Sequence, residues 1–550
     1  MRRLGAIAVV LPVLFFASFA VSTEVGGQAH AVGGRRLARV AGVAAPLRAS
    51  GWVAEENRRP GTAAWRIPDL KTTVGIDGYA DHASVAVGES VGLYVSSRAT
   101  TFHVEAYRMG FYGGAGARLV WRSGALVGVR QPDPVRDTWT HMVEARWRRS
   151  LVVAVGHDWP PGDYLLKLVG SDGAARYVPL TVRDDDARGA LVLLNAVTTW
   201  QAYNLWGGAD LYEGPSGRGK LTDFGHRSRV VSFDRPYAGD GSGSFLGTEY
   251  PLVAFAESLG LDLAYWTDVD LHERPAWLLG QRALLSLGHD EYWSTSMRLG
   301  AADARDGGVN LAFFGANAVF RHIRFETSLL GADRHEINYK RAAEDPLLRT
   351  DRSEVTADWR QAPLSRPESD LVGDLYECNP VKADMVVTEG SAWVFAGTGL
   401  ADGDHIPNLV GPEYDRVQSS VVTPHSIEVL AHSPVRCHGK PSYSDMSYYV
   451  APSGAGVFAT GTNWWICALV GSCPVNAGGH YPETLQRMTE NVLRAFAAGP
   501  AGLVNPSIPN LRRLPTSPPI SVSGEQQRTS GARVAHGSSS SYRGTTSTTR

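Results

Sequence analysis

The stretch that decides the fold is Ala-Leu-Leu-Ser-Leu-Gly-His-Asp-Glu-Tyr-Trp, at residues 283–293. Its apolar half, 283–287, is five residues long and bounded by a glycine, which is typical of a strand buried on both faces. Similar apolar runs occur at 191–194, 263–266 and 311–314. Helical stretches separate these runs, and this alternation predicts an α/β domain around a largely parallel sheet.

The helices between the strands carry start and stop signals. Residues 250–259 place Leu252, Phe255 and Leu259 on one face, and Gly260 can end that helix in the left-handed conformation. Ser294 is a candidate N-cap for the next helix, which Gly307-Gly308 would end. A last helix is predicted at 482–498, where apolar residues recur at helical spacing.

The preceding segment, residues 51–185, has a different pattern. Short alternating stretches separated by turn residues predict an Ig-like β-sandwich with strands at 90–96, 102–108, 118–121, 151–155, 164–169 and 177–182. Asp184-Asp185-Asp186 marks its boundary with the α/β domain, which spans 190–498. After about residue 350 the strands become shorter, so we expect β elements added to that domain.

Both ends of the chain have the composition of segments outside the folded core. Residues 1–31 have the layout of a signal peptide, with Arg2-Arg3, an apolar run and Ala29-His30-Ala31 as a cleavage site. The alternative is an uncleaved membrane anchor. Residues 32–50 are predicted to be a linker, and 502–550, rich in Pro, Ser, Thr and Arg, a disordered tail. We therefore predict a secreted or cell-envelope protein.

Charge and cysteine content narrow the function further. The formal net charge is -2, from 53 basic and 55 acidic side chains, so no global field favours nucleic acid, and we expect a small or neutral partner. The four cysteines in an exported chain predict two disulfides. Of the three possible pairings we prefer Cys467 with Cys473 and Cys378 with Cys437, because the first pair closes a short loop. The oligomeric state is left open.

Polar residues follow the four predicted strands. They occur at 195–204, 267–270, 289–292 and 315–317, the last ending in Asn317. Ligands of open α/β sheets bind at the carboxyl ends of the strands, although Asp and Asn are also ordinary turn and cap residues. No cysteine precedes residue 378, and no Gly-x-Ser-x-Gly elbow follows a strand, which disfavours a Ser or Cys nucleophile. Metal-assisted or acid/base chemistry remains.

Several separated motifs resemble those of the N,N-dimethylformamidase large (β) subunit-like C-terminal domain family, common in exported actinobacterial proteins. They are Trp200-Gln-Ala-Tyr-Asn-x-Trp-Gly-Gly208, Val231-Ser-Phe-Asp-Arg-Pro-Tyr237, Gly288 to Ser294, Asn310-Leu-Ala-Phe-Phe314 and Gly411-Pro-Glu-Tyr-Asp-Arg416. The resemblance covers roughly residues 190–498. It implies a glutamine-amidotransferase-like (flavodoxin-like) α/β fold.

The resemblance also implies a mononuclear iron held by two tyrosines and one glutamate. Carried onto this chain, it makes Tyr292 and Tyr250 the candidate tyrosine ligands and Glu413 the candidate glutamate, with Glu344 and Glu377 as alternatives. His289 and Glu291 are candidate general bases, and Asn317 is a further candidate catalytic residue. A Tyr at a strand end is otherwise most often a packing residue.

Two functions follow from these observations. The first is an exported metal-dependent hydrolase that cleaves a C–N amide bond in a small neutral substrate. The characterised amidase is cytoplasmic and works with a small partner subunit, so the family substrate does not transfer directly. The second is a non-catalytic envelope or glycan-binding protein, suggested by the sandwich and the 15 tryptophans. Packing is the usual role of any single tryptophan, such as those of Trp464-Trp465.

Overall fold

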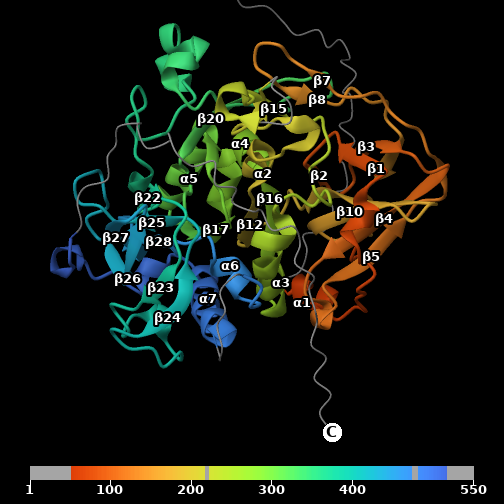
Figure 1. The fold of residues 1–550 in the computed structure, drawn as a ribbon. Coiled ribbons are helices and arrows are strands. Elements are labelled where there is room, and N and C mark those ends of the chain that lie inside the picture. Colours follow the sequence, from red (N-terminus) through yellow and green to blue (C-terminus); the bar gives the residue numbers. More distant parts are fainter. Residues whose placement is uncertain (1–50, 217–221, 474–480, 517–550) are drawn as a thin grey trace, which may run out of the picture. The chain divides into compact units, whose positions relative to one another are not determined.

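The computed structural model describes residues 51–216, 222–473 and 481–516, all of which belong to one compact unit. The predicted signal peptide, the linker and residues 517–550 of the predicted tail lie outside the described residues. The chain folds into a mixed α/β structure with several sheets, as predicted (Figure 1). The Ig-like and flavodoxin-like assignments, and the domain boundaries, remain predictions.

A seven-stranded sheet carries the apolar runs of the α/β segment. Five neighbouring strands are parallel and two more continue the sheet antiparallel, in the order β16 (Leu263–Thr267), β12 (Leu191–Asn195), β17 (Ala283–Leu287), β19 (Asn310–Phe314), β28 (Gly456–Ala459), β27 (Lys440–Val450), β26 (Glu428–Cys437). All four predicted parallel strands are therefore confirmed within one residue at each end.

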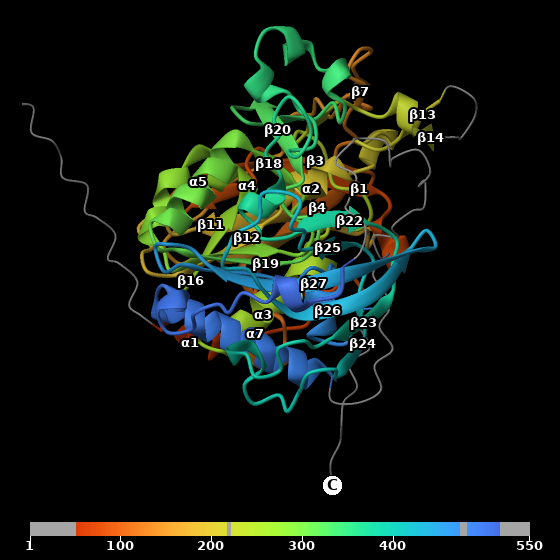
Figure 2. The same ribbon diagram turned by 90° about the vertical axis from the view of Figure 1, so that its left-hand side faces the viewer.

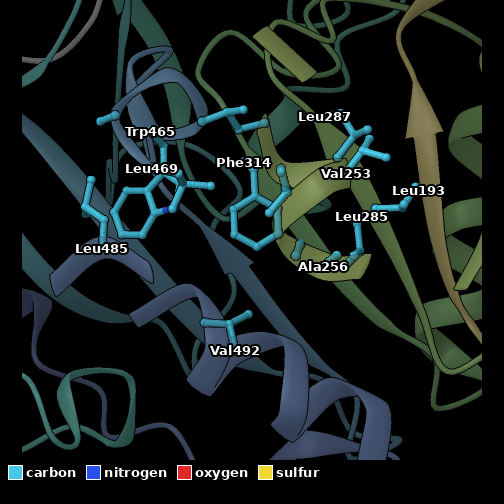
Figure 3. Packing of buried hydrophobic residues seen from close by; sticks show 14 of the residues in the cluster. Leu193, Val253, Ala256, Leu285, Leu287, Phe314, Trp465, Leu469, Leu485 and Val492 are labelled. Atoms are coloured by element: carbon cyan, nitrogen blue, oxygen red, sulfur yellow. The ribbon is translucent and has the colours of Figure 1, made fainter. Parts of the chain in front are cut away.

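Helices cover both faces of this sheet (Figure 2). Odd-numbered residues of β17, such as Leu285, pack with α3 (Tyr250–Ser258) and α7 (Tyr481–Ala498), as Figure 3 shows. Even-numbered residues, such as Leu284, pack with α5 (Thr295–Asp306) on the opposite face. Because side chains of a strand alternate in direction, burial on both faces requires a continuous apolar run.

The predicted helix ends are also confirmed. The Ser294 hydroxyl accepts a hydrogen bond from the Met297 amide at the start of α5, and Gly307 is the residue that ends it. Gly260, with φ +67°, follows the C-cap residue of α3.

The N-terminal segment contains two main sheets. One contains β1 (Ile76–Ala80), β3 (Ser90–Ser97) and β9 (Leu151–Ala154). The other contains β2 (Ser84–Ala86), β11 (Ala175–Arg183), β10 (Gly162–Gly170), β4 (Thr101–Met109) and β5 (Ala117–Arg122), with β6 (Leu126–Val127) paired to β4. A separate apolar core lies between them. The six predicted strands are all present, and β1, β2 and the helix α1 (Trp52–Asn57) are additional.

Smaller elements complete the structure around the central sheet. They are α2 (Val197–Ala202), β13 (Gly214–Pro215), β14 (Thr222–Asp223), β15 (Val230–Ser232), α4 (Asp268–Glu273), β18 (Tyr292–Ser294), β20 (Arg321–Glu326), β21 (His335–Ile337), β22 (Leu375–Cys378), β23 (Ala383–Val386), β24 (His405–Val410), β25 (Tyr414–Arg416) and α6 (Trp465–Ala468), with β7 (Val135–Arg136) and β8 (Val143–Glu144) from the N-terminal segment. Of these, β22, β23, β24 and β25 supply the β additions expected after residue 350.

Two disulfides tie the C-terminal segment together. Cys378 is bonded to Cys437 and Cys467 to Cys473, the preferred pairing of the three. Such bonds are compatible with an extracellular protein. Among the described helices, none is both long and apolar enough to cross a bilayer.

The packed chain extends to residue 516, into the stretch where a tail is predicted. Asn510 is buried there, and its side chain exchanges hydrogen bonds with the backbone of Val429 in β26. A single polar residue that pairs with a strand edge gives almost no compositional signal. The contact between Asn510 and β26 therefore cannot be predicted from the composition of this segment.

Candidate active site

Polar side chains from four parallel strands meet at the carboxyl edge of the central sheet. Tyr203 follows β12 and α2, the segment Gly288–Glu291 follows β17, Asn317 follows β19, and Asn463 follows β28. Neighbouring parallel strands bring their carboxyl ends together, so residues far apart in the sequence become adjacent. The prediction that this edge carries the polar cluster agrees with the structure.

The centre of the cluster consists of three oxygen groups. The Tyr203 and Tyr212 hydroxyl oxygens lie 2.6 Å apart. The Oε2 atom of Glu291 lies 2.7 Å from the Tyr203 oxygen and 2.9 Å from the Tyr212 oxygen. The two phenol rings stack with centroids 4.4 Å apart, which fixes both hydroxyls in the same direction. Two phenols and one carboxylate therefore converge on one point.

Backbone and side-chain contacts hold Glu291 in place. Its amide donates to the Thr199 hydroxyl at 2.9 Å, which ties it to α2. Its Oε1 atom accepts from Arg321 Nε at 3.2 Å. The turn before it requires Gly288, which has φ +61° and whose added Cβ would lie 2.7 Å from the carbonyl oxygen of Thr248. The glycine thus allows the strand to end and Glu291 to face the tyrosines.

His289 and Glu413 form a second pair beside the three oxygens. His289 Nε2 lies 3.1 Å from Glu413 Oε2 and 3.5 Å from Glu291 Oε2. Three amide side chains also face Glu413: Asn379 donates to its Oε1 at 2.7 Å, and Asn317 and Asn463 donate to its Oε2 at 3.0 and 3.4 Å. Glu413 is therefore held as a carboxylate by four donors.

The electrostatics of this pair support a charged form. Burial alone lowers the pKa of His289, but the carboxylates of Glu413 and Glu291 raise it to about 9. Burial raises the pKa of Glu413, yet the charge of His289 and the amides of Asn379 and Asn317 lower it below its ordinary value. Together these shifts describe an imidazolium and a carboxylate facing each other.

The phenols have the opposite environment. Burial and the carboxylate of Glu291 raise the pKa of both Tyr203 and Tyr212 well above the ordinary value. A cation between the three oxygens would offset both effects, because it favours the deprotonated phenol and the carboxylate together.

Two of the predicted metal ligands lie next to these oxygens without belonging to the converging set. The Tyr292 hydroxyl donates to the Tyr212 oxygen at 2.7 Å, and Lys340 Nζ lies 2.5 Å from the Tyr292 oxygen. Glu413 faces His289 and the three asparagines. Tyr292 is fully buried among apolar neighbours from α2 and β20.

Tyr250 is not brought to the cluster. Its hydroxyl donates to the carbonyl oxygens of Gly110 and Gly116, at 3.2 and 3.0 Å, in the turn after β4. The reason is that residue 250 begins α3, which runs along the face of the sheet toward the N-terminal segment. The alternatives also lie elsewhere: Glu344 pairs with Arg227 and Arg229, and Glu377 pairs with Arg416.

Asp290, which lies between His289 and Glu291 in the motif, has a structural role. Its carboxylate accepts from the Ser286 hydroxyl and the Trp293 indole, each at 2.7 Å. Its side chain therefore points back along β17, while His289 and Glu291 contact the cluster.

Tyr203 and Tyr212 are not among the site residues predicted from the sequence. Tyr203 lies inside a motif that was recognised, Trp200 to Gly208, and its place after the first strand was available as a signal. Tyr212 lies in a loop nine residues later and has no positional signal in a single sequence. Arg321, Asn379 and Asn463 also reach the cluster from loops and short strands.

The three central oxygens fit a first-row metal ion. Ligand oxygens at about 2 Å from such an ion lie roughly 2.8–3.3 Å from one another, by analogy with octahedral and tetrahedral oxygen sites. The observed separations of 2.6, 2.7 and 2.9 Å need only slight widening. Phenolate and carboxylate are hard oxygen donors, the kind that suits a hard cation. Elsewhere, Glu144, Asp234 and His335 also cluster, but arginines pair with both carboxylates.

The chain belongs to the family described as N,N-dimethylformamidase beta subunit-like, C-terminal. The family profile matches residues 103–479, more than half of the chain, and spans every residue of the cluster. The assignment made from the sequence motifs is thus confirmed, and the match begins earlier than expected, within β4 of the N-terminal segment. No curated protein is similar enough to give a match.

Two solved structures share low sequence identity with parts of this chain. An uncharacterized protein from Bacillus anthracis str. Ames is 11% identical over 25% of this chain and 94% of its own, with a TM-score of 0.12. A chain from a structure on T cell activation by the bacterial superantigen toxic shock syndrome toxin-1 is 18% identical over 20% of this chain and 99% of its own, also with a TM-score of 0.12. At such TM-scores neither match describes the fold.

Proposed function

We propose that this protein is an exported metal-dependent amidohydrolase that cleaves the C–N bond of a small neutral amide. The family gives an amidohydrolase-like function at a coarse level. The observation that carries the finer proposal is the convergence of Tyr203, Tyr212 and Glu291 beside the His289–Glu413 pair. We propose Tyr203, Tyr212 and Glu291 as the metal ligands in place of Tyr250, Tyr292 and Glu413, the candidates taken from the family resemblance. Iron is the metal we propose for this site.

A metal ion bound by these three oxygens would act as a Lewis acid on the amide carbonyl or on a water molecule. The chain itself moves the protons. In hydrolysis the water oxygen bonds to the carbonyl carbon and the C–N bond breaks, so the leaving nitrogen must gain a proton. His289, held as an imidazolium by Glu413, is placed to donate that proton from Nε2. Asn317 donates to Glu413 Oε2 at 3.0 Å, and so helps to hold the carboxylate that faces His289.

Export is supported by the predicted signal peptide and by the two disulfides. A glycan-binding role has less support. All 15 tryptophans lie within the described residues, and there Trp139 alone is exposed, at 89%. One exposed ring does not form the stacking platform that a sugar-binding surface uses.

The metal content of the mature chain tests the proposal. We expect the protein produced in iron-containing medium to hold one iron per chain and to show a visible phenolate-to-iron band. Tyr203→Phe, Tyr212→Phe and Glu291→Gln each remove one donor oxygen and should lose both the metal and the release of amine from small amides.

Tyr250→Phe is the matched control, because it removes a tyrosine hydroxyl that donates to the backbone carbonyls of Gly110 and Gly116 and does not reach the oxygen cluster. It should keep the metal and the band. A wild-type protein that binds no metal, or a Tyr212→Phe protein that retains the full complement, contradicts the proposal.

A further inference from the structure

A chain of hydrogen bonds runs behind Tyr212, away from the three converging oxygens. Lys340 Nζ donates to the Tyr292 oxygen at 2.5 Å, and the Tyr292 hydroxyl donates to the Tyr212 oxygen at 2.7 Å. The Tyr212 oxygen in turn lies 2.9 Å from Glu291 Oε2. Both hydrogen bonds, from Lys340 to Tyr292 and from Tyr292 to Tyr212, run toward Tyr212, so this series of hydrogen bonds is polarised in one direction.

Lys340 is in an unusual position for a lysine. It is 3% exposed, its Nζ atom lies 3.4 Å from the centre of the Tyr212 ring, and no carboxylate of the described residues forms an ion pair with it. Its backbone has φ +61°, a conformation that a residue with a side chain adopts at a cost. A buried amine on a strained backbone is costly, which points to a role beyond packing.

Lys340 and Tyr292 reach Tyr212 from two different elements. Tyr292 begins β18, one residue after Glu291, and Lys340 follows β21, which pairs with β20. In the parallel pairing of β18 with β20, Tyr292 lies opposite Arg321, which donates to Oε1 of Glu291. The small sheet of β15, β21, β20 and β18 therefore supplies two donors: Tyr292 in β18 donates to Tyr212, and Arg321 in β20 donates to Glu291.

We propose that Tyr292 and Lys340 are positioning residues: Tyr292 donates a hydrogen bond to the Tyr212 oxygen, Lys340 donates one to Tyr292, and together they set the strength of Tyr212 as a metal ligand. This inference rests on the proposed function, because it concerns the same oxygen cluster. A hydrogen bond to a phenolate withdraws electron density from its oxygen and fixes the direction of its lone pairs. Partners of this kind behind a ligand typically contribute about 10- to 100-fold in metal affinity or activity.

The visible spectrum of the iron-loaded protein reads this effect directly. The energy of a phenolate-to-iron transition falls when the phenolate loses a hydrogen bond, because the filled phenolate orbital rises. In Tyr292→Phe and Lys340→Met we expect the band to move to longer wavelength while iron still binds. The iron concentration needed for half-saturation should rise about 10- to 100-fold in Tyr292→Phe.

Two matched variants control for the loss of a buried hydroxyl or amine. Tyr164 is buried in β10 and donates only to the carbonyl of Pro160 among the described residues, and the Lys167 ammonium donates to the carbonyls of Ala64 and Arg66. Tyr164→Phe and Lys167→Met should leave the band position and the iron affinity unchanged. Circular dichroism and thermal unfolding establish that each variant is folded, and Tyr292→Phe suffices if Lys340→Met does not fold.

The outcomes separate this inference from the proposed function. A wild-type protein without iron overturns both. An iron-loaded wild type whose band and affinity are the same in Tyr292→Phe and in the folded Lys340→Met overturns only the positioning role. A shift in Tyr292→Phe that Lys340→Met does not share assigns the effect to Tyr292 and overturns the role of Lys340.

Discussion

Asp163 shows how strongly burial acts on a single residue of this protein. It lies in β10, 3% exposed, and its Oδ1 atom accepts from the Asn195 amide and the Thr181 hydroxyl. Its Oδ2 atom has no partner among the described residues. Burial raises the pKa of this carboxyl to about 7 despite the two hydrogen bonds.

This raised pKa predicts a pH-dependent stability. An unfolded aspartate has a pKa of about 3.9, so above that pH the unfolded chain loses its proton before the folded chain does. The free energy of unfolding therefore falls as the pH rises from about 4 to 7, by roughly 4 kcal/mol at most. Asp163→Asn cannot ionise and keeps the carbonyl acceptor, so it should escape this loss.

Urea unfolding at pH 5 and pH 8 measures the effect. The stability of Asp163→Asn relative to wild type should increase with pH, whereas Asp158→Asn, at an exposed position, should show a constant difference. A difference between Asp163→Asn and wild type that does not change with pH refutes the prediction.

At the scale of elements, the carboxyl ends of β17 and β19 approach each other very closely. A Cβ built on Gly315 would lie 1.7 Å from the carbonyl oxygen of Gly288. That oxygen belongs to the backbone, so it cannot rotate away as a side chain does. The turns that carry His289, Glu291 and Asn317 therefore pack against each other through two glycines.

Gly315→Ala is expected to separate these two turns. The unfolding free energy should fall by about 1–3 kcal/mol or more, as for other overpacked sites, and the affinity for metal should fall with it. Denaturant unfolding and metal titration measure the two effects. Gly124→Ala, where no atom lies within 4 Å of the added Cβ, should change neither. A Gly315→Ala protein with wild-type stability would show that the two turns can shift apart freely.

At the scale of the whole molecule, a buried ion pair joins the N-terminal sheets to the α/β segment. Arg108 Nη2 in β4 lies 2.7 Å from Glu257 Oε1 in α3, and both side chains are fully buried. Arg108 also donates to the Tyr112 hydroxyl and to the carbonyl of Pro161. The two segments therefore share a desolvated pair whose charges depend on each other.

Removal of one charge should destabilise the whole described unit. Arg108→Met and Glu257→Gln are each expected to cost about 3–5 kcal/mol, because the remaining partner stays buried without its counterpart. The double variant should cost less than the sum of the two. Urea unfolding followed by tryptophan fluorescence should show one transition for both segments. Arg494→Ala, which breaks an exposed pair with Glu490, should cost no more than about 0.5 kcal/mol.

Separate unfolding of the two segments, or single variants within 1 kcal/mol of wild type, would refute this coupling. The sequence predicts a boundary near Asp184-Asp185-Asp186 from composition alone. The ion pair between β4 and α3 crosses that boundary, and neither Arg108 nor Glu257 has any sequence feature that identifies its partner.

The sequence by itself determined the strands, the helices and the place of the site. The apolar runs at β12, β16, β17 and β19 are continuous because both faces are buried, and this local property is visible in a single chain. The Ser294 cap and Gly260 are equally local signals. Parallel strands share a carboxyl edge, so the strand ends alone predict that His289, Glu291 and Asn317 lie close together at the candidate site.

Only the tertiary structure decided which residues complete that site. Tyr203 and Tyr212 converge on Glu291 because α2 and the loop after it fold back over the edge of the sheet, and Tyr250 is turned away because α3 runs toward β4. The distance between two hydroxyl oxygens depends on every dihedral angle between them. A single sequence specifies the elements through short-range patterns, whereas these contacts arise from packing between segments that are remote in the chain.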